Sequence, residues 1–159
     1  MSNREFELRA SASELSELVG ARSKDIDNWL QRPELLTRFK STRTGARRSV
    51  SRLNVIELAF LAAFVRTGIK ASTAVKLASD FAVRANRKEL SDWLVFEPGE
   101  DPSGAGTLDH LPSTETLTLR TATARPPIVV LINVGEMVRR IDEVFSTRLI
   151  RRELKLTRD

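Results

Sequence analysis

The hydrophobic positions between Ser13 and Gly20 follow the spacing of a helix. Leu15, Leu18 and Val19 form an i, i+3, i+4 stripe, which predicts an amphipathic helix. Ser13 is the expected N-cap, because its hydroxyl can accept from an early helix amide. Gly20 is the expected end, since glycine tolerates the positive φ that closes a helix.

A second stripe follows at once. Ile26, Trp29 and Leu30 share one helical face, so we expect a short helix capped by Ser23 and stopped by Pro33. The chain between the two stripes is too short for anything but a tight turn. The pattern therefore predicts two helices joined by a turn.

Two further helices are predicted downstream. The first begins at Ser51 or Asn54 and ends at Gly68, and it is apolar on most sides, so we expect it to be buried. The second covers residues 71–84. Between the two helix pairs, the segment around Thr44-Gly45 is typical of a two-stranded hairpin.

The pattern changes after Arg87. Alternating or continuous apolar runs predict strands within residues 1–10 and at residues 93–98, 114–123 and 128–134. Residues 99–113 are rich in Gly, Pro and Asp and predict a long exposed loop. An amphipathic helix is expected from Gly135 onward. These elements together predict an α+β fold.

Composition narrows the classes of protein. The chain has 159 residues, 41% of them hydrophobic, and no cysteine. The length suits one domain, or a small domain with an appendage. The lack of cysteine excludes disulfides, thiol catalysis and thiolate metal sites. No apolar run approaches the roughly 18 residues of a membrane span, and the N-terminal residues lack the apolar core of a secretion signal. We therefore expect a cytoplasmic protein without a membrane partner.

The positive charge is concentrated in one segment. The net charge is +5, but residues 20–52 hold nine basic and three acidic residues, a local excess of +6, while the rest of the chain carries −1. A local excess of this kind is typical of a surface that binds nucleic-acid phosphates. The alternative is an ordinary solvated, charge-rich hairpin.

The first half of the chain resembles the DNA-binding domain of the MerR family of bacterial regulators. The residues that carry the resemblance are Ser13-Glu14-Leu15, Gly20, Ile26, Trp29, Leu35-Leu36, Gly45-Ala46-Arg47, Ser51, Val55, Leu58 and Gly68-Ile69. The resemblance implies a winged helix-turn-helix over residues 1–86. Residues 87–159 would then form an α+β dimerisation or partner- or ligand-binding region, with a small antiparallel sheet and a long amphipathic helix.

The resemblance also implies which residues contact DNA. The second helix would enter the major groove and present its N-terminal side chains to base edges, where Asn pairs with adenine and Arg or Lys with guanine. The expected set there is Arg22, Ser23, Lys24 and Asn28. The wing would contact phosphates or the minor groove, through Arg38, Lys40, Thr42, Arg43, Arg47 and Arg48.

Catalytic chemistry has little support in the sequence. His110 is the sole histidine, and Asp101 and Asp109 near it do not make a convincing metal site. Gly104-Ala105-Gly106 lacks the strand, helix and lysine of a phosphate-binding loop. We therefore expect no enzyme activity, no cofactor and no bound metal.

These observations favour a sequence-specific, double-stranded-DNA-binding transcriptional regulator, bacterial or phage-like and nucleoid-associated. The helix from Gly135 either packs on the sheet or pairs with a second chain, and a homodimer would place two recognition helices on two half-sites. An architectural accessory factor of the excisionase or phage-recombination kind shares the winged fold. A protein-interaction adaptor is the third alternative, motivated by Asp25 and Asp27 on the recognition helix.

Overall fold

The computed structural model combines helices with two antiparallel sheets, which confirms the α+β class. It describes residues 7–32, 35–36, 39, 47–98, 106–111 and 130–156, of which 95–98, 106–111, 130 and 149–156 are described as backbone only. The elements are β1 (Leu8–Ala10), α1 (Ala12–Val19), α2 (Ser23–Leu30), β2 (Arg48–Val50), α3 (Arg52–Arg66), α4 (Ala71–Asn86), β3 (Trp93–Pro98), β4 (Gly106–Leu111), β5 (Val130–Asn133) and α6 (Val134–Leu156).

Helix α1 begins earlier than the sequence pattern predicts. Its N-cap is Ser11, not Ser13, because the Ser11 hydroxyl accepts from the Glu14 amide and the Glu14 carboxylate accepts from the Ser11 amide. This reciprocal pair is a capping box: the serine hydroxyl satisfies the Glu14 amide, and the glutamate satisfies the Ser11 amide, which a lone N-cap serine would leave open. The helix ends at Gly20, whose φ of 70° confirms the predicted stop.

Helix α2 follows after a short turn. It begins at Ser23, but its N-cap is Arg22 and no side chain caps it, so the prediction of a Ser23 cap is wrong. Ile26, Trp29 and Leu30 are buried on one face, as predicted. Their packing, rather than a terminal hydrogen bond, holds this short helix in place.

Strands β1 and β2 form a two-stranded antiparallel sheet. Leu8 pairs with Val50 and Ala10 with Arg48, and the inward residues of both strands are buried. The partner of β2 in the described structure is thus the N-terminal strand. The predicted hairpin turn at Thr44-Gly45 lies outside the described residues.

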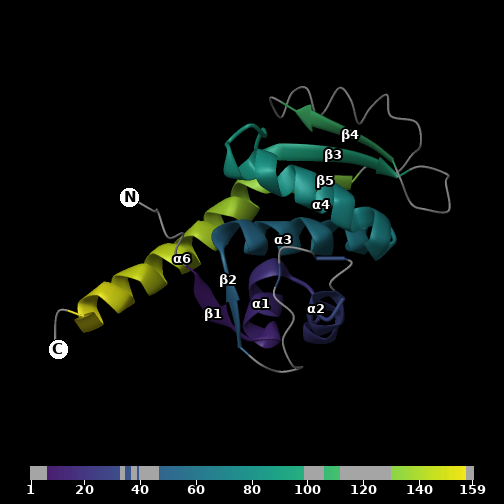
Figure 1. Cartoon of the computed structure of the whole chain (residues 1–159). Coiled ribbons are helices and arrows are strands. Elements are labelled where there is room, and N and C mark those ends of the chain that lie inside the picture. The colour runs from purple at the N-terminus through teal and green to yellow at the C-terminus, as the bar shows by residue number, and fades with distance from the viewer. Residues whose placement is uncertain are drawn as a thin grey trace.

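Helix α3 lies at the centre of the molecule (Figure 1). Its N-cap is Ser51, which confirms the first of the two predicted starting points, whereas Asn54 lies inside the helix and completes a second capping box with Ser51. Phe60 and Phe64 of α3 are fully buried, and their ring centroids lie 5.8 and 5.9 Å from that of Phe81 on α4. The three rings tie α3 to α4 in the core.

The second sheet has the strand order β4-β3-β5, antiparallel throughout. The segment 99–113 is therefore not wholly a loop: residues 106–111 form β4, with Trp93 opposite Leu111 and Pro98 opposite Gly106. Pairing with β3 overrides the turn-forming composition there. The strand predicted at residues 114–123 lies outside the described residues.

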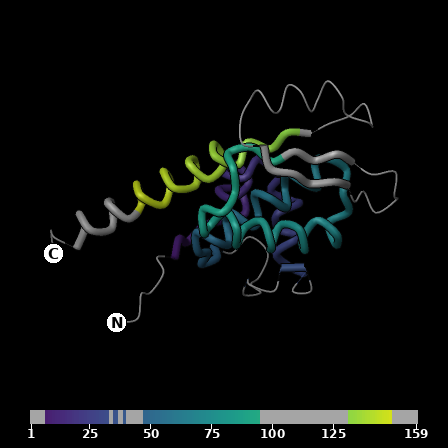
Figure 2. Tube along the Cα trace, turned by 90° about the horizontal axis from the view of Figure 1, so that it is seen from above, coloured from purple at the N-terminus to yellow at the C-terminus, as the bar shows by residue number. Residues whose placement is uncertain are grey.

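Helix α6 joins the two halves of the chain. It continues directly from β5 and packs against α3 and α1 (Figure 2). Leu94, Ile141 and Phe145 belong to the same buried cluster as the residues of α1 and α3, so the two predicted regions, residues 1–86 and 87–159, share a core. Beyond this core α6 leads away from the body of the molecule (Figure 1). None of the helices in the described ranges is long and apolar enough to cross a membrane.

Candidate nucleic-acid interface

Helix α2 presents polar side chains on the face opposite its buried stripe. Arg22, Lys24 and Asn28 are exposed, and Ser23 is half-exposed. The helical period turns Lys24 and Asn28 away from the apolar stripe, whereas Arg22 is the N-cap that precedes the helix and Ser23 is the first helical residue. The main partner of α2 among the described elements is α1, and α6 lies on the other side of α1 from it (Figure 1). The structure therefore leaves the four predicted base-reading residues in one accessible place.

Arg48 does not behave as predicted for the wing. Its side chain is only 2% exposed, and its Nη1 donates to Asp27 Oδ1 at 3.2 Å. A guanidinium enclosed in this way does not present itself to a DNA phosphate, so Arg48 leaves the set of predicted contacts. The reason is the register of β2: Arg48 lies opposite Ala10, on the inward face of the small sheet.

The ion pair accounts for Asp27, an acid that is unusual on a predicted recognition helix. Asp27 lies on α2 and Arg48 begins β2, so their bond ties α2 to the strand that follows the basic segment. Among the described residues, Arg48 Nε and Nη2 have no hydrogen-bond partner. Asp27 is thus the one described group that compensates the buried charge. Asp25 lies in the first turn of α2, where a carboxylate interacts favourably with the helix dipole.

The basic segment, residues 38–47, begins and ends next to residues that belong to the core. Leu36 and Phe39 are buried on its N-terminal side, at 1% and 9% exposure. On its C-terminal side Arg47 is exposed and β2 follows. Arg38, Lys40, Thr42 and Arg43 lie outside the described residues, so their predicted contacts stay predictions.

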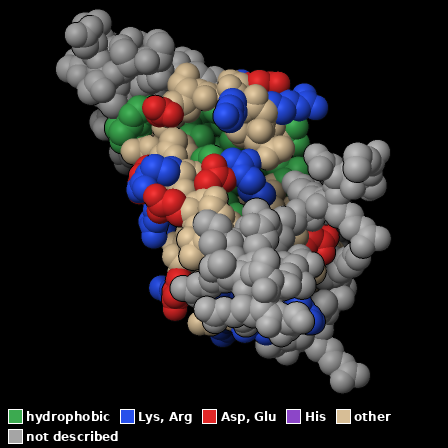
Figure 3. Space-filling model, turned by 90° about the vertical axis from the view of Figure 1, so that its left-hand side faces the viewer, with side chains coloured by type: hydrophobic (Ala, Val, Ile, Leu, Met, Phe, Trp, Pro, Cys, Tyr) green, Lys and Arg blue, Asp and Glu red, His purple; other side chains and the backbone are tan. Residues whose placement is uncertain are grey.

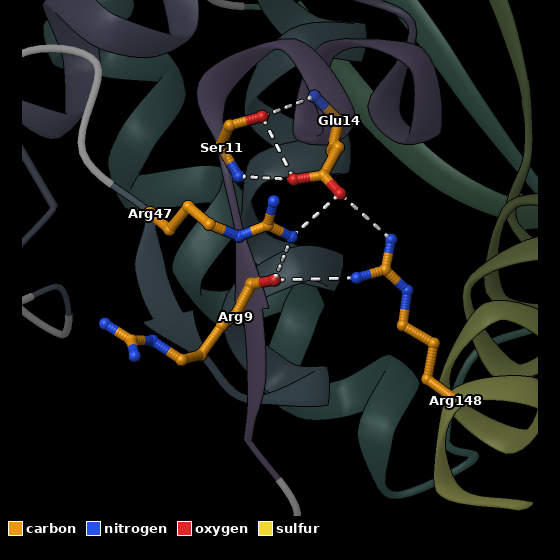
Figure 4. Close-up of polar contacts among 5 residues, drawn as sticks. All are labelled: Arg9, Ser11, Glu14, Arg47 and Arg148. Atoms are coloured by element: carbon orange, nitrogen blue, oxygen red, sulfur yellow. Dashed lines mark hydrogen bonds and ion pairs between the residues drawn. The ribbon is translucent and has the colours of Figure 1, made fainter. Parts of the chain in front are cut away.

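Glu14 binds Ser11, Arg47 and Arg148, and sequence reasoning did not single it out. Its Oε1 accepts from Arg47 Nη2 at 3.0 Å and from Arg148 Nη2 at 3.2 Å, and its Oε2 accepts from Ser11 (Figure 4). The Ser-x-x-Glu pattern of a capping box was the available signal for Glu14. No local signal points to Arg148, because its contact spans 134 positions along the chain.

The contacts of Glu14 predict a pH dependence of stability. The Ser11 amide, followed by the Ser11 hydroxyl and the two arginines, lowers the pKa of Glu14 from 4.5 to about 2. A carboxyl whose pKa falls on folding stabilises the protein above its unfolded pKa, and this contribution is lost as the pH falls through the folded pKa. We expect the stability difference between the native chain and Glu14→Gln to shrink between pH 4.5 and 2.

Chemical denaturation at several pH values measures this difference. Glutamine keeps the capping-box geometry while removing the charge, so the comparison isolates the ionised carboxylate. A difference that stays constant from neutral to strongly acidic pH would contradict the assigned pKa.

The other residues considered for chemistry are Asp101, Asp109 and His110. Asp109 and His110 lie in β4 rather than in a loop, and Asp101 lies outside the described residues. Among the side chains that the structure describes, no three His, Cys, Asp or Glu residues are grouped as a metal site. A hollow of about 650 Å³ lies between the end of α4, the start of β3 and α6, and Lys88, Asp92 and Arg139 are among the residues that line it.

The face from which α6 projects carries charges of both signs (Figure 3). Several of them are paired: Arg52 with Asp142, and Arg139 with Glu136 and Glu143. Such exposed pairs contribute little stability each. They also neutralise this part of α6, so its charge differs from that of the α2 surface.

No protein-family model matches the chain, and no curated protein matches it.

Proposed function

We propose that the protein is a sequence-specific, double-stranded-DNA-binding transcriptional regulator with a winged helix-turn-helix in its first half. The observation that carries the proposal is the accessible polar face of α2, where Lys24 and Asn28 are exposed opposite a buried stripe and the N-cap residue Arg22 is exposed at the start of the helix. The length and chemistry of this face fit the major groove, which admits a helix. The resemblance to the MerR family supports the same assignment.

In this proposal the side chains of α2 read base edges. Arg22 and Lys24 donate to guanine, and Asn28 pairs with adenine; each good contact of this kind discriminates by about 1–3 kcal/mol. Ser23 donates to a base or a phosphate. The ion pair between Asp27 and Arg48 sets the position of α2 relative to the start of β2.

The basic segment before β2 supplies contacts that do not depend on sequence. Lys and Arg side chains bind phosphates and release counterions, which makes affinity fall as salt rises. Arg38, Lys40 and Arg43 come from the sequence alone. Arg47, at 55% exposure, is the described member of the group.

The second half of the chain would assemble the regulator. A homodimer through α6 and the second sheet would place two copies of α2 on two half-sites, spaced by one helical turn of DNA or a multiple of it. The same region can bind a protein partner. Sedimentation or light scattering of the purified chain measures the oligomeric state directly.

Removing basic residues from the proposed wing is expected to change the salt dependence of DNA binding strongly. In the triple variant Arg38→Ala, Lys40→Ala, Arg43→Ala, the slope of log Kobs against log salt should fall in magnitude by up to about 3, because each lost phosphate contact removes about 0.9. Fluorescence anisotropy with a labelled duplex measures the slope. The thermal midpoint of the variant is measured alongside, so that a loss of folding is recognised.

A matched triple variant controls for net charge. Lys70→Ala, Lys76→Ala and Arg87→Ala also remove three exposed cations, but at α4, across α3 from α2 (Figure 1). The slope of this control should stay near that of the native chain. Equal slopes for the two triple variants would mean that charge alone drives binding. No salt-sensitive duplex binding by the native chain would favour an interaction adaptor, and footprints of many tandem copies would favour an architectural accessory factor.

A further inference from the structure

We infer that the phosphate-binding surface extends beyond the winged half onto helix α6, through Arg148 together with Arg9 and Arg47. This inference rests on the proposed DNA binding and adds a contact surface to it. The three arginines come from α6, β1 and the residue before β2. Arg148 and Arg47 follow Arg9 by 139 and 38 positions along the chain, yet the three residues meet at one place.

The meeting point is defined by shared acceptors. Arg47 and Arg148 both donate to Glu14 Oε1, at 3.0 and 3.2 Å, and both donate to the backbone carbonyl of Arg9, at 3.1 and 3.5 Å. Figure 4 shows the two guanidinium groups on either side of these oxygens. Two arginines held so close together repel each other, and this repulsion raises the free energy of the fold unless an anion, here Glu14, lies between them.

One carboxylate does not balance three arginines. The guanidinium of Arg9 points away from Glu14 (Figure 4) and has no partner among the described contacts. Arg47 and Arg148 remain 55% and 35% exposed while bound to Glu14. The cluster itself thus holds two more guanidinium groups than carboxylates, while Glu17 and Glu143 line the same hollow as Arg148. A guanidinium group without a bound carboxylate is a donor for a further anion such as a phosphate.

The place of the cluster in the fold indicates which anion. Glu14 lies in the first turn of α1, the first helix of the helix-turn-helix. In such motifs the first helix crosses the DNA backbone while the second enters the groove. Arg47 is also the last residue of the basic segment. The cluster thus lies beside the path that the phosphates would take if α2 occupies the major groove.

The remainder of α6 has a matching charge. Residues 148–156 include four basic residues and one acidic residue, and this part of the helix leads away from the body (Figure 1). Earlier in α6, by contrast, Arg139 is committed to Glu136 and Glu143. The net positive charge of α6 therefore begins at the cluster.

The test is a salt titration of duplex binding with the full chain. Native protein and Arg148→Gln are compared on a mixed-sequence duplex of about 30 base pairs, between about 50 and 200 mM salt, where phosphate contacts dominate. We expect the magnitude of the log–log slope to fall by about 0.9 in Arg148→Gln. Arg148→Lys, which keeps the charge, should retain the native slope.

Two further variants separate a DNA contact from a structural clamp. Arg139→Gln removes a charge from the same helix, nine positions away and so on the opposite face, and should leave the slope unchanged. Arg9→Gln removes a guanidinium that makes no hydrogen bond or ion pair among the described contacts, and should lower the slope by about 0.9. The thermal midpoint of each variant is measured alongside, so that loss of folding is recognised.

Three outcomes would overturn the inference. An unchanged slope in both Arg148→Gln and Arg9→Gln, with a lowered slope in the wing variant, would reject the surface on α6 but leave the proposed function standing. An equal loss in Arg148→Gln and Arg148→Lys, with no loss in Arg9→Gln, would make Arg148 a clamp for α6 only. If native protein shows no salt-dependent duplex binding, the proposed function fails and takes the inference with it.

Discussion

Replacing Asp27 with alanine is expected to lower the free energy of unfolding by about 3 kcal/mol, at the low end of the 3–5 kcal/mol typical for breaking a buried ion pair. The cost arises because Arg48 stays 2% exposed and loses its described anionic partner. Asp27 itself is 20% exposed, which allows some water to compensate and places the effect at the low end. Urea denaturation followed by circular dichroism measures the loss.

The control is the neighbouring acid on the same helix. Asp25→Ala removes a carboxylate with no described side-chain partner, so only its interaction with the helix dipole, about 0.3–1 kcal/mol, should be lost. The double variant Asp27→Leu, Arg48→Met should recover much of the stability, since apolar replacement of a buried pair is often neutral or better. Equal losses in Asp27→Ala and Asp25→Ala would contradict the ion pair as a determinant of stability.

The Asp27–Arg48 bond also predicts a change in the proposed DNA binding. If it sets the position of α2, the double variant should fold and yet bind its specific site more weakly, while its salt slope stays near that of the native chain. Phosphate contacts determine the slope, whereas base contacts determine specificity. The same denaturation and anisotropy measurements report both properties.

Truncating Phe60 to alanine should lower the free energy of unfolding by about 3–5 kcal/mol, the range found for Phe→Ala in well-packed cores. Phe60 is 0% exposed, and its ring lies 6.0 Å from Phe64 and 5.8 Å from Phe81. Removing it leaves a cavity and breaks the aromatic contacts between α3 and α4. Thermal or urea denaturation measures the loss.

Leu131 provides the contrast for Phe60. It is a large apolar residue on β5 but is 38% exposed, so Leu131→Ala should cost no more than about 0.5 kcal/mol. A loss below about 1 kcal/mol for Phe60→Ala would show that α3 and α4 repack freely around the gap. Together the two variants test whether α3 is the centre of the core.

The spacing of hydrophobic residues predicted the helices well, because each helix buries a stripe of residues that lie close together in the sequence. The stripe Ile26, Trp29 and Leu30 is buried as expected, and Gly20 ends α1 with a positive φ. The caps were harder, since Ser11 and Ser13 are chemically alike and only the reciprocal bond with Glu14 distinguishes them. Strand β4 was missed because its pairing with β3 lies outside any local window.

In the candidate interface, too, some features follow from the sequence and others depend on the fold. The exposure of Lys24 and Asn28 follows from the helical period, and the N-cap residue Arg22 is accessible as well. The burial of Arg48 does not follow from its neighbours in sequence: it depends on which face of β2 packs inward once β1 becomes its partner. Pairing register turns one arginine outward, at position 47, and the next one inward.

The sequence by itself determined the α+β class, the order of the helices, the accessible face of α2 and the concentration of positive charge between residues 20 and 52. These properties depend on hydrophobic period and composition, which act over a few residues. Only the tertiary structure decided that Asp27 binds Arg48 and that Glu14 gathers Arg47 and Arg148. Those contacts join segments 21 to 134 positions apart, and such distances are closed by packing of the core rather than by local propensity.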